Sequence, residues 1–270
     1  MYGIAKASGL NALITTDSSV SELAHVFPFL KTLKSDERRP GFYFPKFREH
    51  KAYGFDLRAF SLNYMKDIEL LGLFQSWRYF DHVRAEIRQQ FAFSRSAVGL
   101  VQTFLHEATA NVKQTALEGG TFDADFKRFP LTYVGVHVRR MGYDTQQMRD
   151  LGYKSADLNY IYAAMHYFRH KYKNVIFIVT SDDLQWCQQN VNAPNNVVVY
   201  SNFKHHGLDM CLLTQCNHTI TTTGAFSWWA GWLSGGTVLY YKDHPVPKSE
   251  LAKEFKAVDY FPTDWLPIMS

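Results

Sequence analysis

The sequence has 270 residues, of which 46% are hydrophobic and 20% charged, with a formal net charge of +4. This composition is typical of a globular chain and excludes a disordered or fibrous protein. The mild basic excess suits an anionic ligand, and without finger spacing, basic-region heptads or ribonucleoprotein motifs no nucleic-acid partner is expected.

The first half of the chain predicts helices separated by irregular segments. Its first residues lack the basic start and apolar run of a signal peptide; they read as the end of an amphipathic helix that stops at Gly9. The spacing of apolar residues and the positions of Pro and Gly then predict a short strand at 12–15, helices at 19–34, 72–91 and 97–116, and a loop at 36–51.

The stretch 118–130 is the expected domain boundary, because it combines two glycines, mixed charges and a proline. It divides the chain into a partial N-terminal α/β domain, residues 1–120, and a C-terminal Rossmann-like domain, residues 121–270.

The second half alternates between continuous apolar strands and helices. Strands without polar alternation, each followed by a helix, predict an α/β fold with a parallel sheet covered on both faces. The uncharged stretch 219–241 is long enough to cross a bilayer but fits a strand, helix, turn and buried strand better. The predicted strands are 131–138, 175–180, 197–200, 218–222 and 238–241, and the predicted helices are 156–172, 184–191, 207–215 and 225–233.

Ligands of such sheets bind beyond the carboxyl ends of the strands, and His137, Arg139 and Arg140 come at the end of the first one. Arginine clamps a diphosphate with paired, charge-assisted hydrogen bonds. Because adjacent side chains on a strand point to opposite faces, only one arginine is expected to lie on a ligand unless the strand has already turned. An ion pair with neighbouring carboxylates is the alternative.

Ser181, Asp182 and Asp183 follow the second strand. Ser181 or Asp182 is expected to cap the next helix, and one carboxylate could also hold a nucleotide base or ribose hydroxyl.

Thr222, Thr223 and Gly224 precede the helix at 225–233, where free N–H groups and the helix dipole attract phosphate. Trp228 and Trp229 fit the core better than a sugar site. Without a metal-binding motif after a strand, arginines and helix-end amides are expected to stabilise a departing diphosphate without a divalent cation.

The three cysteines, Cys187, Cys211 and Cys216, cannot close a disulfide framework and have no zinc spacing. At least one buried thiol is expected, and a bond between two of them stays open if the compartment is oxidising. The sequon Asn217-His218-Thr219 marks Asn217 as a candidate glycosylation site.

Four segments together resemble the α-1,2-fucosyltransferase family. They are FQSWRYF at 74–80, HVRRMGYD at 137–144 (the family has HVRRGD), SDDLQWCQQN at 181–190, and the run from Asp209 through LLTQCNHTI to TTTGAFSWWAGWLSGG, which ends at Gly236.

The resemblance implies a two-domain GT-B architecture and transfer of L-fucose from GDP-fucose to a galactose 2-hydroxyl of a glycan, with inversion and no metal. It implies Golgi lumenal action as a glycoprotein, with membrane association only through an upstream anchor, and a chain that begins inside the helix after the family's glycine-rich loop. It also implies donor binding by Ser227 and a general-base candidate in Asp144, which Met141 displaces from the family's spacing; a base from the N-terminal half is equally compatible. The alternatives are an inactive GDP-sugar-binding protein and a fucosyltransferase of other linkage, to core N-glycan or a protein hydroxyl.

Overall fold

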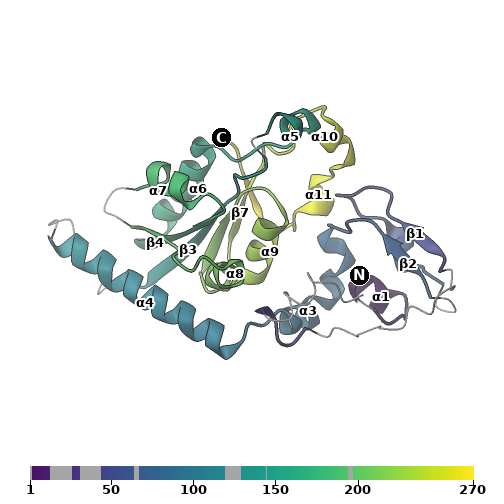
Figure 1. The fold of residues 1–270 in the computed structure, drawn as a ribbon, viewed down its shortest axis with the longest axis horizontal. Coiled ribbons are helices and arrows are strands. Elements are labelled where there is room, and N and C mark those ends of the chain that lie inside the picture. Colours follow the sequence, from purple (N-terminus) through teal and green to yellow (C-terminus); the bar gives the residue numbers. More distant parts are fainter. Residues whose placement is uncertain are drawn as a thin grey trace. The chain divides into compact units, whose positions relative to one another are not determined.

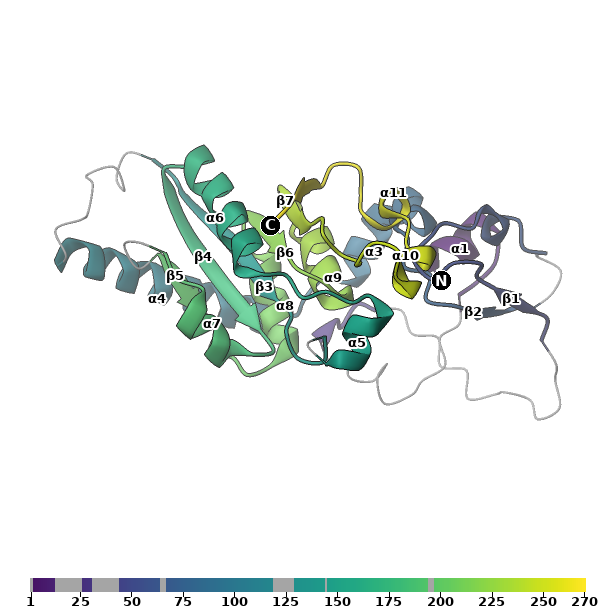
Figure 2. The same cartoon turned by 90° about the horizontal axis from the view of Figure 1, so that it is seen from above.

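The computed structural model describes residues 2–12, 26–30, 44–63, 67–118, 129–143, 145–193 and 197–270. These residues belong to two compact units, each built from more than one stretch of the chain (Figures 1 and 2). The first unit comprises Met1–Ser94 and Glu250–Thr263, and the second comprises Arg95–Ser249 and Asp264–Ser270.

The expected boundary at 120/121 differs from this division at two places. Helix α4 (Arg95–Glu118) packs against α8 (His206–Thr214), and the hydroxyl of Thr109 on α4 hydrogen-bonds that of Tyr133 at 2.5 Å, so α4 clusters with the second unit. The stretch 250–263 returns to the first unit. Most of the expected linker at 118–130 lies outside the described residues.

A six-stranded parallel sheet forms the centre of the second unit, which confirms the predicted α/β class (Figure 1). Its strand order is β5-β4-β3-β6-β7-β8. The edge strand β8 (Leu266–Ile268) was not predicted, because it is short and contains Pro267, a residue unfavourable inside a sheet but tolerated at its edge. The strands are β3 (Leu131–Val138), β4 (Asn174–Ser181), β5 (Val198–Tyr200), β6 (His218–Thr221), β7 (Val238–Tyr241) and β8 (Leu266–Ile268).

Helices cover both faces of this sheet, as expected for a parallel sheet. Helices α6 (Leu158–Lys171) and α7 (Leu184–Asn190) lie on one face, whereas α8 and α9 (Ala225–Ser234) lie on the other, with α4 packed on α8 (Figures 1 and 2). The short helix α5 (Gln146–Leu151) follows β3.

Alternation along β3 decides which face of the sheet each of its side chains lies on. Val134, Val136 and Val138 belong to the hydrophobic core under α6. Successive residues of a strand face opposite sides, so His137 lies on the α8–α9 face, where its ring contacts Phe226 of α9.

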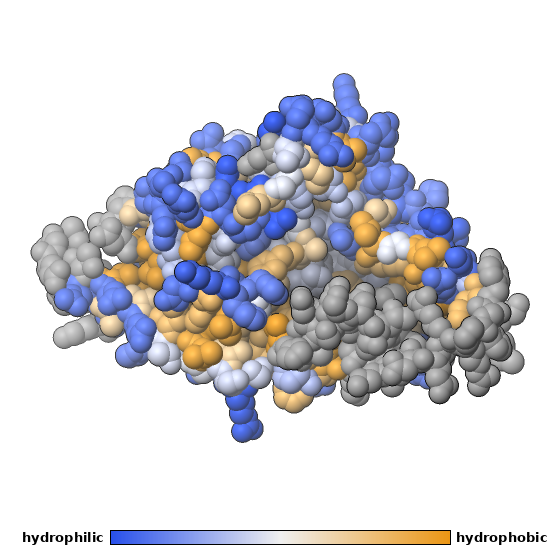
Figure 3. All heavy atoms as spheres, viewed as in Figure 1, coloured by the Kyte–Doolittle hydropathy of each residue, from blue (hydrophilic) through white to orange (hydrophobic). Residues whose placement is uncertain are grey.

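The uncharged stretch 219–241 folds as β6, α9 and β7, which confirms its interpretation as part of the sheet domain. Within the described ranges, no helix combines the length and the apolar character that a membrane crossing requires. On the face that Figure 3 presents, hydrophilic residues cover α5 and α7, and hydrophobic residues gather around α8.

The first unit contains short elements. The predicted N-terminal helix is confirmed: it ends before Gly9, whose φ of 68° favours glycine. The predicted loop at 36–51 contains β1, which pairs in parallel with β2. The predicted strand at 12–15 and helix at 19–34 lie largely outside the described residues. The elements are α1 (Tyr2–Ala7), β1 (Lys46–Arg48), β2 (Glu69–Leu71), α3 (Arg84–Gln90), α10 (Glu250–Glu254), α11 (Ala257–Tyr260) and 3₁₀ turns at Leu57–Phe60, Trp77–Tyr79 and Asp81–Val83.

The helix predicted over 72–91 was wrong in its first half. Phe74 has a φ of 48°, and the Ser76 hydroxyl accepts a hydrogen bond from the Arg78 backbone N–H at 3.3 Å, which caps a single 3₁₀ turn. Only α3 is α-helical in this stretch. Side-chain bonds to distant segments override the local helical pattern here.

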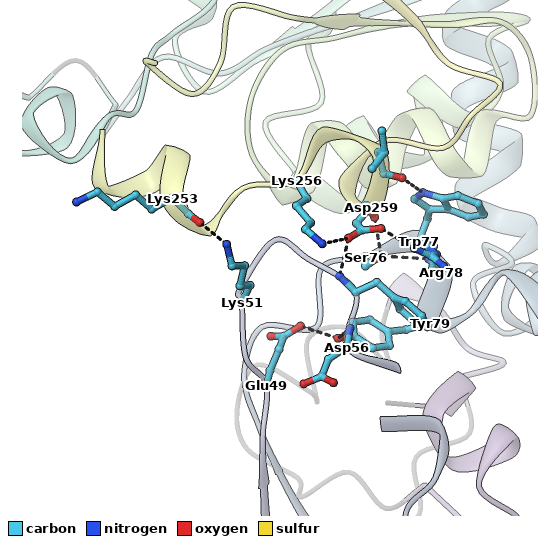
Figure 4. Close-up of polar contacts among 12 residues, drawn as sticks. Glu49, Lys51, Asp56, Ser76, Trp77, Arg78, Tyr79, Lys253, Lys256 and Asp259 are labelled. Atoms are coloured by element: carbon cyan, nitrogen blue, oxygen red, sulfur yellow. Dashed lines mark hydrogen bonds and ion pairs between the residues drawn. The ribbon is translucent and has the colours of Figure 1, made fainter. Parts of the chain in front are cut away.

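Two buried carboxylates hold this irregular segment within the first unit (Figure 4). Asp259 on α11 pairs with Arg78 at 2.8 Å and accepts a hydrogen bond from the Phe55 backbone N–H at 3.1 Å. Glu49 accepts hydrogen bonds from the Phe74 backbone N–H at 2.8 Å and from the Tyr79 hydroxyl at 3.2 Å. Burial raises the pKa of Tyr79, so its hydroxyl stays protonated and can donate.

Candidate functional site

The candidate site lies where the strand order reverses, between β3 and β6 at the centre of the sheet. From β3 the chain builds outward through β4 and β5, then returns to add β6, β7 and β8 on the other side. In open parallel sheets, this switch point opens a crevice at the carboxyl ends of the strands. The backbone N–H of Arg139, just after β3, donates to Oγ1 of Thr222, just after β6, at 3.0 Å. The two predicted loops therefore meet.

Asp182, at the end of β4, organises the loop after β3. Its carboxylate accepts hydrogen bonds from the backbone N–H groups of Arg140 at 2.9 Å and Met141 at 3.1 Å. It also pairs with Nη1 of Arg139 at 2.8 Å. Asp182 therefore holds the loop that carries Arg139 and Arg140, called the arginine loop below. The sequence had suggested two other functions for Asp182, a helix cap or a nucleotide contact.

The expectation that Ser181 or Asp182 caps the following helix was wrong, because Asp183 is the cap. The Asp183 carboxylate accepts a hydrogen bond from the Trp186 backbone N–H at 3.1 Å, at the start of α7. Ser181 is used inside the turn: its hydroxyl donates to the Val138 carbonyl at 2.7 Å and accepts from the Asp183 N–H at 2.9 Å.

The two arginines leave β3 in different settings, because the strand ends at Val138. The Arg139 guanidinium pairs with Asp182 and lies 5.5 Å from the ring centroid of Tyr143. The Arg140 guanidinium lies 3.8 Å from the ring centroid of Trp186, with Nε 3.6 Å from the Asp183 carboxylate. Both arginines therefore pair with carboxylates, and both lie at the carboxyl end of β3.

Trp186 was not among the predicted site residues. The signal that could have found it is its place three residues after Asp183, in the first turn of a helix that starts at the functional edge. An aromatic face there offers a cation–π surface to a guanidinium from the neighbouring strand.

Helix α9 begins beside this arginine loop. Its cap, Gly224, has a φ of 94°, which favours glycine. Ser227 is fully buried, and its hydroxyl accepts a hydrogen bond from the Thr222 backbone N–H at 2.8 Å. Ser227 therefore shapes the turn between β6 and α9.

Buried polar atoms without a hydrogen-bond partner in the described part of the chain include Oγ1 of Thr180, Oγ1 of Thr223 and Nδ1 of His137, all near the carboxyl ends of the strands. Burial lowers the pKa of His137 to about 3, with a smaller contribution from the Arg139 charge, so the imidazole is neutral. Buried polar atoms are normally hydrogen-bonded, so unpaired ones beside a helix start mark a place suited to a polar group.

The remaining candidate residues are Asn217, Trp228, Asp144 and the three cysteines. Asn217 is exposed at the opposite end of β6, where its Oδ1 accepts a hydrogen bond from the Tyr133 backbone N–H at 2.8 Å. Trp228 is buried and stacks on Trp232, in keeping with a core residue. Asp144 lies outside the described residues. The cysteines are buried free thiols, so the open possibility of a disulfide is not realised: Cys187, Cys211 and Cys216.

These features define a class of protein: an α/β domain whose switch point joins a loop that carries two arginines to the N-terminus of a helix. Each of these groups is suited to bind phosphate oxygens. The comparisons with known proteins agree with this class. The sequence model of glycosyl transferase family 11 matches residues 56–269, so the chain belongs to that family.

Two relatives that the chain matches are fucosyltransferases by name. Galactoside alpha-(1,2)-fucosyltransferase 1 of Bos taurus is 36% identical over 206 residues, which are 74% of this chain and 53% of that protein. Galactoside alpha-(1,2)-fucosyltransferase 2 of Bos taurus is 35% identical over 204 residues, or 74% of this chain and 55% of that protein. The chain thus spans about half the length of these relatives.

Among solved structures, the glycosyl transferase family 9 protein from Veillonella parvula DSM 2008 is similar over 61% of this chain and 40% of that one. The TM-score is 0.31 and the sequence identity 14%, which is too low to carry an argument about fold.

Proposed function

We propose that this chain transfers L-fucose from GDP-fucose to the 2-hydroxyl of a galactose in a glycan. Its family membership and the printed names of relatives about 35% identical support galactoside α-1,2-fucosyl transfer. The observation that carries the proposal is the hydrogen bond between Arg139 and Thr222, because it joins the arginine loop and the start of α9 at the switch point of the sheet.

The chemistry proposed is one displacement at the anomeric carbon, with inversion. The acceptor hydroxyl gives its proton to a general base and attacks the anomeric carbon, the bond from that carbon to the diphosphate oxygen breaks, and GDP carries the electron pair away. Arg139, Arg140 and the N–H groups at the start of α9 then stabilise the charge on the diphosphate. Charge-assisted hydrogen bonds contribute about 1.5–3 kcal/mol each, so these donors can act without a divalent cation.

The arginine environment supports this assignment. Asp182 engages one nitrogen of Arg139, whereas a guanidinium carries five N–H donors in a planar fork. Arg140 is held over Trp186, which leaves its charge intact. Both guanidinium groups can therefore donate hydrogen bonds to a diphosphate while their protein contacts hold them in place.

The general base belongs on the face of the sugar opposite the leaving group. Asp144 stays a candidate, as does a base from the N-terminal half. Replacing Asp144 with Asn separates these candidates: if Asp144 is the base, turnover falls at least a hundredfold while GDP affinity is kept.

We propose Golgi lumenal action as a glycoprotein, with a galactose-terminated glycan as the second substrate. The exposed position of Asn217 supports glycan attachment there. Mobility shifts after glycosidase treatment of the secreted wild type and an Asn217→Gln variant test this assignment; no shift for the wild type would contradict it.

The activity is tested by incubating the chain with GDP-fucose and a β-galactoside, and by linkage analysis of the product. We expect an α-1,2-linked fucose, and we expect Arg139→Ala and Arg140→Ala each to lower GDP affinity and turnover at least tenfold. Near-normal values for both variants would contradict the diphosphate assignment.

Other outcomes of the same assay would redirect the proposal. GDP binding without transfer to any acceptor would indicate a GDP-sugar-binding protein. A product linked to core N-glycan or to a protein hydroxyl would indicate a fucosyltransferase of other linkage.

A further inference from the structure

Tyr143 lies against the start of α9, although it comes from the loop after β3. Its hydroxyl oxygen is only 3.1 Å from the position that a Cβ atom on Gly224 would occupy. Gly224 therefore serves two purposes: it adopts a positive φ, and its missing side chain makes room for the phenol.

The same phenol ring is next to the first arginine of the loop. The Arg139 guanidinium carbon lies 5.5 Å from the ring centroid. Tyr143 thus stands between the two groups to which the proposed function assigns the diphosphate: Arg139 and the N–H groups that directly follow Gly224.

The ring is held in this place from two sides. The Tyr143 backbone N–H donates to the Arg140 carbonyl at 3.3 Å, in a turn where Gly142 has a φ of 87°. The ring also stacks on Tyr153, with centroids 5.0 Å apart and planes 29° apart. Because the ring is fixed, its hydroxyl needs little ordering to meet a ligand.

Buried polar atoms near the start of α9 have no hydrogen-bond partners in the described part of the chain. Thr223 Oγ1, one residue before Gly224, and His137 Nδ1, whose ring lies 4.8 Å from that of Phe226 in the first turn of α9, are both buried and unpartnered within the described residues. Both side chains are more than nine-tenths buried. They are independent evidence that this helix start is built to meet a polar group.

We infer that Tyr143 is a further donor-binding residue, whose phenol hydroxyl hydrogen-bonds the departing diphosphate between Arg139 and the start of α9. The inference rests on the proposed function and adds a neutral donor to its cationic ones. Burial raises the pKa of Tyr143, followed by the influence of Tyr153, so the hydroxyl keeps its proton and can donate to a phosphate oxygen.

The test compares the full chain with its Tyr143→Phe variant, which keeps the ring and removes only the hydroxyl. GDP, inorganic pyrophosphate and guanosine are titrated into each protein by calorimetry. We expect Tyr143→Phe to weaken GDP and pyrophosphate about tenfold or more, the effect of losing one hydrogen bond to a charged group. Guanosine, which has no phosphate, should bind both proteins equally.

Turnover supplies a second readout, because a hydroxyl that stabilises the leaving group lowers kcat as well as donor affinity. Tyr167→Phe on α6 is the matched control, since it makes the same chemical change away from the site. Both variants should keep the wild-type melting temperature within about 2 °C.

Three outcomes would overturn the inference in different ways. Equal GDP and pyrophosphate affinities for Tyr143→Phe and wild type would remove Tyr143 from the site but leave the proposed function standing. Tighter binding by Tyr143→Phe would show that the phenol obstructs the ligand. A folded wild type that binds neither GDP nor pyrophosphate would contradict the proposed function, and the inference about Tyr143 with it.

Discussion

The Arg140 guanidinium carbon lies 3.8 Å from the ring centroid of Trp186, so an arginine of the loop after β3 rests on an aromatic face from the first turn of α7. This contact joins two segments more than 40 residues apart in the sequence. A cation over an indole face is stabilised by about 0.5–2 kcal/mol. Trp186 therefore acts as a positioning residue that orients Arg140.

The stacking makes a graded prediction for Trp186. Trp186→Leu should weaken GDP binding about two- to thirtyfold, the range that corresponds to a lost cation–π contact, whereas Trp186→Phe should lose less because it keeps an aromatic face. Calorimetric titration with GDP measures both. If Trp186→Leu and Trp186→Phe both bound GDP as weakly as Arg140→Ala, damage to packing would explain the result and the cation–π role would be contradicted.

Asp182 is expected to act through the loop that it holds. Asp182→Ala removes three interactions at once, with the N–H groups of residues 140 and 141 and with Arg139, so GDP affinity should fall at least tenfold. Asp182→Asn keeps one acceptor oxygen and should lie between Ala and wild type. The control is Asp150→Asn on exposed α5. Wild-type affinity in Asp182→Ala would contradict a positioning role.

We expect the stability of the first unit to depend on Asp259, which lies in its C-terminal segment Glu250–Thr263. Its carboxylate is buried and pairs with Arg78 (Figure 4), and removing one partner of a buried pair costs about 3–5 kcal/mol. Because the Arg78 side chain is partly exposed, Asp259→Ala should destabilise by somewhat less, about 2–3 kcal/mol. Urea unfolding followed by fluorescence measures this change.

Glu250→Ala is the matched control for Asp259, since it removes an exposed carboxylate of the same segment that pairs with Lys253. Exposed ion pairs contribute about 0–1 kcal/mol. Similar unfolding midpoints for both variants would show that the Asp259–Arg78 pair does not stabilise the unit.

His137 predicts a pH dependence of stability. Burial lowers its pKa in the folded chain to about 3 from an ordinary value of 6.5. Between these values the unfolded chain binds more protons, so the stability contributed by neutral His137 is complete above pH 6.5 and is lost as the pH falls toward 3. One pKa unit corresponds to about 1.4 kcal/mol, so the loss at pH 5 is about 2 kcal/mol.

His137→Gln cannot titrate, so its unfolding free energy should fall less than that of the wild type between pH 7.5 and pH 5. The difference between the two slopes is the readout, because it is independent of any baseline change in stability. Histidines 218 and 244 also have lowered pKa values and remain in the variant, which therefore keeps part of the acid sensitivity. Identical slopes would contradict the buried, neutral state of His137.

The parallel α/β domain could be predicted from local patterns in the sequence. The continuous apolar runs at 131–138 and 238–241 coincide with β3 and β7, and α7, α8 and α9 begin or end within one residue of their predicted bounds. Such runs, and the turns between them, are local signals. A fully buried strand needs apolar residues on both faces, whichever segments of the chain pack against it. The sequence also placed Arg139 and Thr222 at strand ends on the same edge.

The contacts of the candidate residues, in contrast, became known only from the folded structure. Asp182 holds the arginine loop, whereas Asp183 caps α7. Trp186 supports Arg140, and Tyr143 reaches Gly224. Most of these contacts depend on side chains that follow separate strands and meet at the carboxyl end of the sheet. The irregular course of residues 72–83 has the same cause. Hydrogen bonds to Glu49 and Asp259, distant in sequence, outweigh a helical pattern whose own propensity contributes only tenths of a kcal/mol per residue.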